Sequence, residues 1–200
     1  MRTRVPEKLI KILEDIDANG NASLTRLTVL KKWFEAPGHK NNNRLRAFAV
    51  WVAQRAVSRK GKTGGAAGQL FSEARALLGG LGKVCPTLPA KAAADLHQRL
   101  RDFQSEFESQ QWGAVRIINN WNLLLAEQAL AIWLWHHDSP SHGYKLAADY
   151  CQHYDSRYGN GLNGPARTKL KEMVRFMFSM EALEDESHAL ENCNPGDQPA

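Results

Sequence analysis

The 200-residue sequence lacks the cysteine pattern of a disulfide framework or a zinc ribbon. Its three cysteines, Cys85, Cys151 and Cys193, are widely separated and form no C-x-x-C pair. Small disulfide-rich secreted domains and structural zinc ribbons use closely spaced cysteines, usually in even number. The pattern therefore excludes both classes, and we expect a reduced, cytoplasmic setting.

Long apolar runs are also lacking. Basic residues open the chain, but charges recur at Lys11, Glu14 and Asp15, so no apolar segment of a secretory signal follows them. The most apolar stretch, residues 121–135, is interrupted by polar residues and is shorter than the ~20 apolar residues that cross a bilayer. We expect neither a secretory signal nor a membrane span.

Alternation of apolar and polar residues, the mark of a half-buried strand, does not extend over more than a few positions. Apolar residues recur instead at helical steps, and glycine, proline and asparagine separate the periodic segments. The sequence therefore predicts an all-α fold without a β-sheet, a multi-helix bundle of seven to eight helices. The expected helices cover about residues 5–16, 24–36, 44–60, 70–78, 96–107, 112–136, 143–158 and 165–180.

The expected helix over residues 112–136 is apolar around most of its circumference, which is typical of a helix enclosed by others. Glycines and prolines between residues 79 and 89 mark the best internal boundary. We therefore expect a basic N-terminal helical module over residues 1–83 and a helical bundle around the central helix over residues 89–190. A flexible acidic tail is expected over residues 191–200, and the two helical parts are also compatible with one domain.

Charge is distributed unevenly. Residues 1–62 carry 14 Lys and Arg against 5 Asp and Glu, a net charge of +9, whereas residues 63–200 carry 12 against 16, a net charge of −4. The net charge of +5 for the whole chain conceals this difference. Such asymmetry favours an anionic partner or an intramolecular match between the two parts.

One helix face in the basic part combines cations with aromatic rings. At 100° per residue four cations fall within a 60° stripe, with two aromatic residues beside it. Cations on one face suit phosphates, and the rings are able to stack on bases or receive guanidinium groups. The alternative is a solvated basic face whose arginine stems cover Trp51. The candidate binding residues are Arg44, Phe48, Trp51, Arg55, Arg59 and Lys62.

A second cluster gathers imidazole and carboxylate groups around a turn: His136, His137 and His142, with Asp149 and His153 spaced i, i+4 on the next expected helix. These are metal-ligand types. Neither H-E-x-x-H nor the paired Glu-x-x-His of di-iron bundles is present, and histidine is also favoured near a helix C-terminus by the helix dipole. We predict no cofactor and no catalytic residue, and keep a metal site as an alternative.

Residues Asp15, Asp17, Asn19 and Gly20 have the spacing that opens an EF-hand calcium loop, and the segment also resembles one repeat of a dockerin module. At the twelfth position of such a loop, where a bidentate carboxylate is needed, the chain has Arg26. We therefore predict no calcium site.

Glu127 and Gln128 interrupt the most apolar helix and are the best candidates for buried polar groups. A carboxylate in such a place is most often part of a structural pair, for which an arginine or histidine of a neighbouring helix is the expected partner.

The sequence favours a non-enzymatic, cytoplasmic binding or regulatory protein that contacts an acidic partner through its basic N-terminal helical face. Nucleic acid is the first partner to test, and an acidic protein is the other. Two alternatives remain. One is a homodimeric helical interaction or scaffold protein, because six tryptophans are more than a monomer of this size usually covers. The other is a metal-dependent enzyme that uses the histidine and aspartate cluster.

Overall fold

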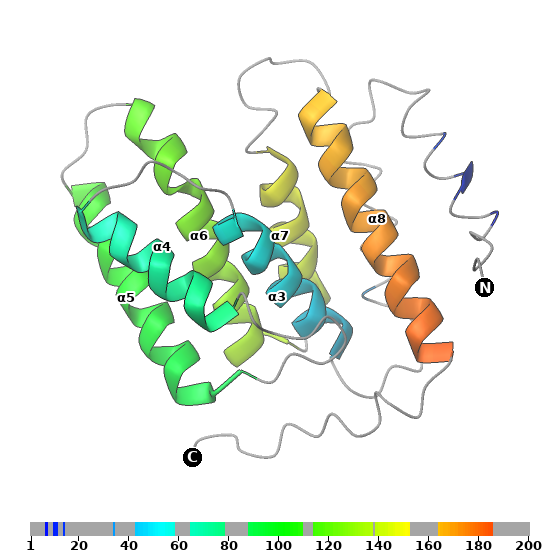
Figure 1. The fold of residues 1–200 in the computed structure, drawn as a ribbon, viewed down its shortest axis with the longest axis horizontal. Coiled ribbons are helices and arrows are strands. Elements are labelled where there is room, and N and C mark those ends of the chain that lie inside the picture. Colours follow the sequence, from blue (N-terminus) through cyan, green and yellow to red (C-terminus); the bar gives the residue numbers. More distant parts are fainter. Residues whose placement is uncertain are drawn as a thin grey trace.

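The computed structural model of the chain describes residues 43–58, 65–78, 88–109, 114–137, 139–152 and 164–185, together with Glu7, Ile10, Lys11, Glu14 and Phe34. These ranges hold six α-helices and no strand (Figure 1), so the expected all-α fold is confirmed for the described residues. The expected number of seven to eight helices is not confirmed, because the segments 5–16 and 24–36 lie almost wholly outside this part. The helices are α3 (Asn43–Ser58), α4 (Gly65–Leu78), α5 (Ala90–Ser109), α6 (Ala114–Leu134), α7 (Pro140–Gln152) and α8 (Gly164–Asp185).

Three helices begin earlier than the periodicity of apolar residues predicts: α5 starts at Ala90, before the expected position 96, and two others start at a glycine or a proline. The first, α4, starts at Gly65, whose φ of 69° lies in the left-handed region that glycine adopts without a steric penalty. The second, α7, starts at Pro140, three residues before the expected start. Proline suits a first helical position because its fixed φ is already helical and it lacks the N–H that would have no partner there. The turn expected around Pro140 is therefore the first turn of the helix.

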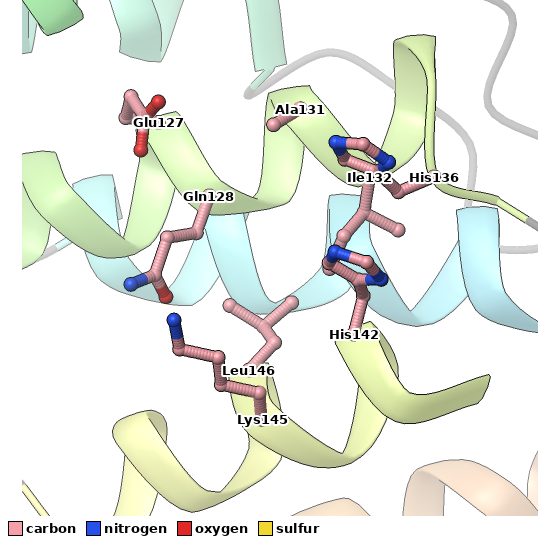
Figure 2. A pocket seen from close by; sticks show the side chains of 8 residues that line it. All are labelled: Glu127, Gln128, Ala131, Ile132, His136, His142, Lys145 and Leu146. Atoms are coloured by element: carbon pink, nitrogen blue, oxygen red, sulfur yellow. The ribbon is translucent and has the colours of Figure 1, made fainter. Parts of the chain in front are cut away.

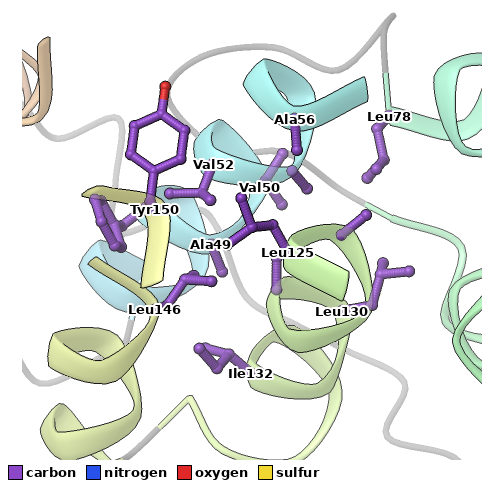
Figure 3. Packing of buried hydrophobic residues seen from close by; sticks show 14 of the residues in the cluster. Ala49, Val50, Val52, Ala56, Leu78, Leu125, Leu130, Ile132, Leu146 and Tyr150 are labelled. Carbon is purple, nitrogen blue, oxygen red and sulfur yellow. The ribbon is translucent and has the colours of Figure 1, made fainter. Parts of the chain in front are cut away.

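The centre of the fold is formed by α3 and α6, which pack more extensively against each other than any other pair of described helices. Residues 44–57 of α3 are buried on nearly every side, and the small side chains of Ala49, Ala53 and Ala56 let neighbouring helices approach closely. Figure 3 shows α3 side chains packed against Leu125, Leu130 and Ile132 of α6. The helix expected at the centre, residues 112–136, shares that position with the helix expected to carry the basic face.

The remaining helices surround this pair (Figure 1). Helices α4 and α5 pack against each other and against α6 on one side, whereas α7 packs against α3, α6 and α8 on the other. One hydrophobic cluster includes residues from all six helices. The expected parts 1–83 and 89–190 therefore both contribute to it, and their separation into two domains stays a prediction.

Two of the expected features lie outside the described ranges, and a third expectation concerns membrane spans. The acidic tail over residues 191–200 and the EF-hand-like segment from Asp15 to Gly20 are not among the described residues. In the part that the structure describes, none of the helices is both long enough and apolar enough to cross a membrane.

Candidate functional site

Two of the six predicted binding residues, Arg44 and Phe48, lie inside the protein. Arg44 is 8% exposed and Phe48 is fully buried, with its ring centroid 5.1 Å from that of Phe34 and 6.1 Å from that of Phe176. The stripe is covered here because α3 is surrounded by other helices, and the periodicity of α3 alone does not contain that information. Phe48 is therefore a core residue whose ring is not accessible to a nucleic-acid base.

Trp51 lies in the same aromatic cluster, at the border between core and surface. Its ring is partly buried, 5.1 Å from Phe176 on α8 and 5.7 Å from Tyr150 on α7, measured between centroids. Aromatic pairs at such distances stabilise a packed core beyond the area that they bury. Trp51 thus holds α3 against two neighbouring helices.

The exposed part of the stripe is the C-terminal end of α3. Arg55 is exposed, and its Cζ lies 5.4 Å from the centroid of the Trp51 ring, within cation–π range. Arg59 and Lys62 follow the end of α3 in the sequence but are outside the described residues.

Sequence reasoning missed a cation at this end of α3. Arg75 on α4 is exposed, and its Nε and Nη2 donate hydrogen bonds of 3.1 and 3.0 Å to the carbonyl oxygen of Val57. The last carbonyls of a helix have no partner within the helix and carry its negative dipole end, so a guanidinium stabilises them. Arg75 is 18 residues from Val57 along the chain, so a pattern within one helix does not predict the contact.

The histidines of the predicted metal cluster point in different directions. The rings of His136 and His142 are stacked, with centroids 4.3 Å apart and planes inclined by 2°. The lone pairs of ring nitrogens lie in the ring planes, so two parallel stacked rings do not direct them at one ion. His142 Nδ1 lies 2.8 Å from Ser139 Oγ and shares a hydrogen bond with it.

His137 turns away from this stack toward α3, where its ring nitrogens lie 3.1 and 3.2 Å from Nη2 of Arg46. The Arg46 guanidinium also lies over the Trp133 ring, with Cζ 5.4 Å from the centroid. Burial lowers the pKa of Arg46 below the ordinary value of arginine. His137 and Arg46 therefore connect the end of α6 to the start of α3.

The remaining predicted ligands do not complete a metal site in the described part of the chain. Asp149 is partly buried on α7, and His153 is outside the described residues. Across the described ranges, no three His, Cys, Asp or Glu side chains come together in a geometry able to hold a metal ion.

A pocket of about 170 Å³ lies between α6 and α7 (Figure 2). Apolar side chains and polar groups from both helices share its lining, including the two stacked histidines. The lining residues are Glu127, Gln128, Ala131, Ile132, His136, His142, Lys145 and Leu146.

Glu127, in the wall of this pocket, has the histidine partner that the sequence led us to expect. His97 Nε2 on α5 lies 2.8 Å from Glu127 Oε1, and the two side chains are 6% and 16% exposed. The Trp135 ring meets His97 edge to face at 4.8 Å. A fixed carboxylate thus lines the pocket.

Gln128, one residue further along α6, has an acceptor atom without a hydrogen-bond partner in the described part of the protein. That atom, Oε1, is buried. Figure 2 shows the Lys145 side chain on α7 extending toward the Gln128 amide. A buried acceptor without a donor costs free energy, so it marks a position where a ligand has an interaction to gain.

No protein-family model matches the chain, and the comparison with curated proteins and with solved structures finds no significant match either. The functional argument therefore depends on the residues of the chain itself.

Proposed function

We propose that this protein is a non-enzymatic binding protein that contacts the phosphates of a nucleic acid through the C-terminal end of α3. The proposed contact region, which we term the basic corner, comprises Arg55 and Arg75, together with the cations that follow α3 in the sequence, Arg59, Lys60 and Lys62. Arg55 carries the proposal, because it is exposed and its guanidinium lies over the Trp51 ring. In the sequence, three further cations follow Arg55 within seven residues.

Arg55 and Arg75 support the proposal through their position. Each is exposed, and each is held near the end of α3 by a partner of its own, the Trp51 ring for Arg55 and the Val57 carbonyl for Arg75. A positioned arginine loses less conformational entropy on binding, and its fork of N–H donors matches the oxygens of a phosphate.

The proposed contact is electrostatic and does not include base stacking. Phe48 is buried, and Arg55 already lies over the Trp51 ring. Phosphate contacts carry no sequence information by themselves, so we expect binding that depends strongly on salt and weakly on nucleotide sequence.

The proposal is tested by fluorescence anisotropy with labelled single-stranded and double-stranded oligonucleotides, titrated with the full chain at several salt concentrations. Replacing two cations by the double charge reversal Arg55→Glu and Arg59→Glu should weaken binding about tenfold or more at low salt. The slope of log affinity against log salt should fall by roughly 1.5, because each phosphate contact contributes about 0.7–0.9.

Arg101→Glu is the matched control, because it reverses an exposed cation on α5, a helix that does not belong to the basic corner. It should leave the salt slope unchanged. Absence of oligonucleotide binding by the wild-type chain at low salt would contradict the proposal, as would equal losses for Arg101→Glu and the double variant. Binding of an acidic polypeptide in place of oligonucleotides would identify a protein partner and also contradict it.

The described tryptophans give little support to the homodimer alternative. Trp51, Trp121 and Trp133 are partly buried and packed against the hydrophobic core, and Trp135 is the one that is exposed, at 53%. Of the four tryptophans whose side chains are described, three thus have a role within the subunit.

A further inference from the structure

We propose that the pocket between α6 and α7 binds a small zwitterion, an α-amino acid with a short apolar side chain. The proposal concerns a surface separate from the basic corner and does not depend on nucleic-acid binding.

The size of the pocket sets the size of the ligand. Its volume is about 170 Å³. An apolar cavity of about 150 Å³ accommodates benzene in another protein, whereas drug-sized ligands need about 300–1,000 Å³. The pocket therefore encloses a group of fewer than about ten non-hydrogen atoms.

The polar groups at one end of the pocket match the head group of an amino acid. Glu127 supplies a carboxylate that His97 holds in place, and Gln128 supplies a buried oxygen without a donor in the described part of the protein. Both are acceptors, and an ammonium group has three N–H donors to offer.

Lys145 supplies the opposite charge at the same end. It is exposed, and its side chain extends from α7 toward Gln128 (Figure 2). The carboxylate of an α-amino acid is separated from its ammonium by one carbon atom, so both charges of the ligand find a complementary group at this end. A ligand with only one of the two charges leaves one group of the pocket without a partner.

The rest of the pocket favours an apolar side chain on the ligand. Ala131, Ile132 and Leu146 form an apolar surface between the charged end and the stacked rings of His136 and His142. Burying apolar area of the ligand against this surface stabilises the complex. The parallel stacking of the two rings also argues against a metal ion as the occupant.

The proposal is tested with three probes that share a 3-methylbutyl group: L-leucine, 4-methylpentanoate, which lacks the ammonium, and 3-methylbutylamine, which lacks the carboxylate. Binding to the full chain is measured from chemical-shift changes in ¹H–¹⁵N correlation spectra. L-Leucine should bind at least about tenfold more tightly than either analogue, because each loses one charge-assisted interaction.

Two variants connect this preference to the pocket. Lys145→Met should weaken L-leucine binding to about the level of 3-methylbutylamine and should not weaken binding of the amine, because the substitution removes a cation close to the proposed ammonium site. Gln128→Leu should weaken both L-leucine and the amine. Lys91→Met, at an exposed position in the first turn of α5, is the control and should change none of the affinities.

Several results would overturn the proposal. Equal affinities for L-leucine and 4-methylpentanoate would show an anion site instead of a zwitterion site. If L-leucine still bound more tightly than 3-methylbutylamine in Lys145→Met, the carboxylate would be bound elsewhere. If L-leucine at about 10 mM caused no chemical-shift changes in the wild type, the pocket would not bind this class of ligand.

Discussion

Glu127 and Gln128 are neighbours on α6, yet burial has opposite consequences for the two side chains. Glu127 has a hydrogen-bonding partner in His97, at 2.8 Å. Gln128 Oε1 has no partner in the described part of the protein. Removing one member of a buried pair leaves the other unsatisfied, whereas removing an unsatisfied group ends a cost that the folded state already bears.

We therefore expect opposite changes in stability when each is replaced by leucine. Glu127→Leu should lower the free energy of unfolding by about 1–3 kcal/mol, because it leaves the buried His97 without its acceptor. Gln128→Leu, a change of similar volume, should raise it by about 1 kcal/mol. Urea denaturation of the two variants and the wild type measures both. Changes of the same sign would mean that the hydrogen bonding described for this pair of residues is wrong.

These two residues also show what the sequence could reveal about the site. Their polarity within an apolar helix is visible in the sequence and singled them out. The residues that surround them in the fold cannot be read from the sequence, because His97 lies 30 residues before Glu127 and Lys145 lies 17 residues after Gln128. Contacts of that range depend on how helices pack, which a single-helix periodicity does not determine.

At the scale of the helices, periodicity identified the elements better than it identified their exposure. The ends of α3 and α6 agree with the expected segments closely, whereas α8 extends to Asp185, beyond the expected end at residue 180. The exposure of α3 was the main error: a stripe of cations favours solvent, but the alanines around it allow close packing on the other sides. As a result Arg44 and Phe48 belong to the interior, and within residues 44–58 of α3 the exposed side chains are those of Arg55 and Ser58 in the last turn.

The approach of α7 to α3 gives a test at this scale. A Cβ atom added at Gly143 would lie 2.5 Å from Leu45 Cδ1 and 2.9 Å from the Phe34 ring. Overpacking of this kind costs about 1–3 kcal/mol, and the better helix propensity of alanine offsets about 1 kcal/mol of it. Gly143→Ala should therefore lower the free energy of unfolding by up to about 2 kcal/mol.

Repeating Gly143→Ala in a Leu45→Val variant separates the steric clash with Leu45 from other effects of the substitution. Leu45→Val removes the δ-carbon that the new methyl group would meet, so Gly143→Ala should be less destabilising in Leu45→Val than in the wild type. Thermal or urea denaturation of the four proteins completes the cycle. Equal effects of Gly143→Ala in both backgrounds would contradict the close contact between α7 and α3.

At the scale of the whole molecule, the uneven charge is the feature that the proposed function explains. The net charge of +9 over residues 1–62 lies in the part of the sequence that contains α3. Because α3 is buried over most of its length, its exposed charge is concentrated at its C-terminal end. The pocket between α6 and α7 lies outside this charged part, which is why the two binding sites are proposed separately.

The most direct test of nucleic-acid binding is size-exclusion chromatography with light scattering on protein purified straight from a cell lysate. The ratio of absorbance at 260 nm to that at 280 nm is recorded at low and high salt. We predict a nucleic-acid signal that accompanies the protein at low salt and separates from it at high salt, because phosphate contacts weaken steeply as salt rises. A protein peak free of nucleic acid at both salt concentrations would contradict the proposed function.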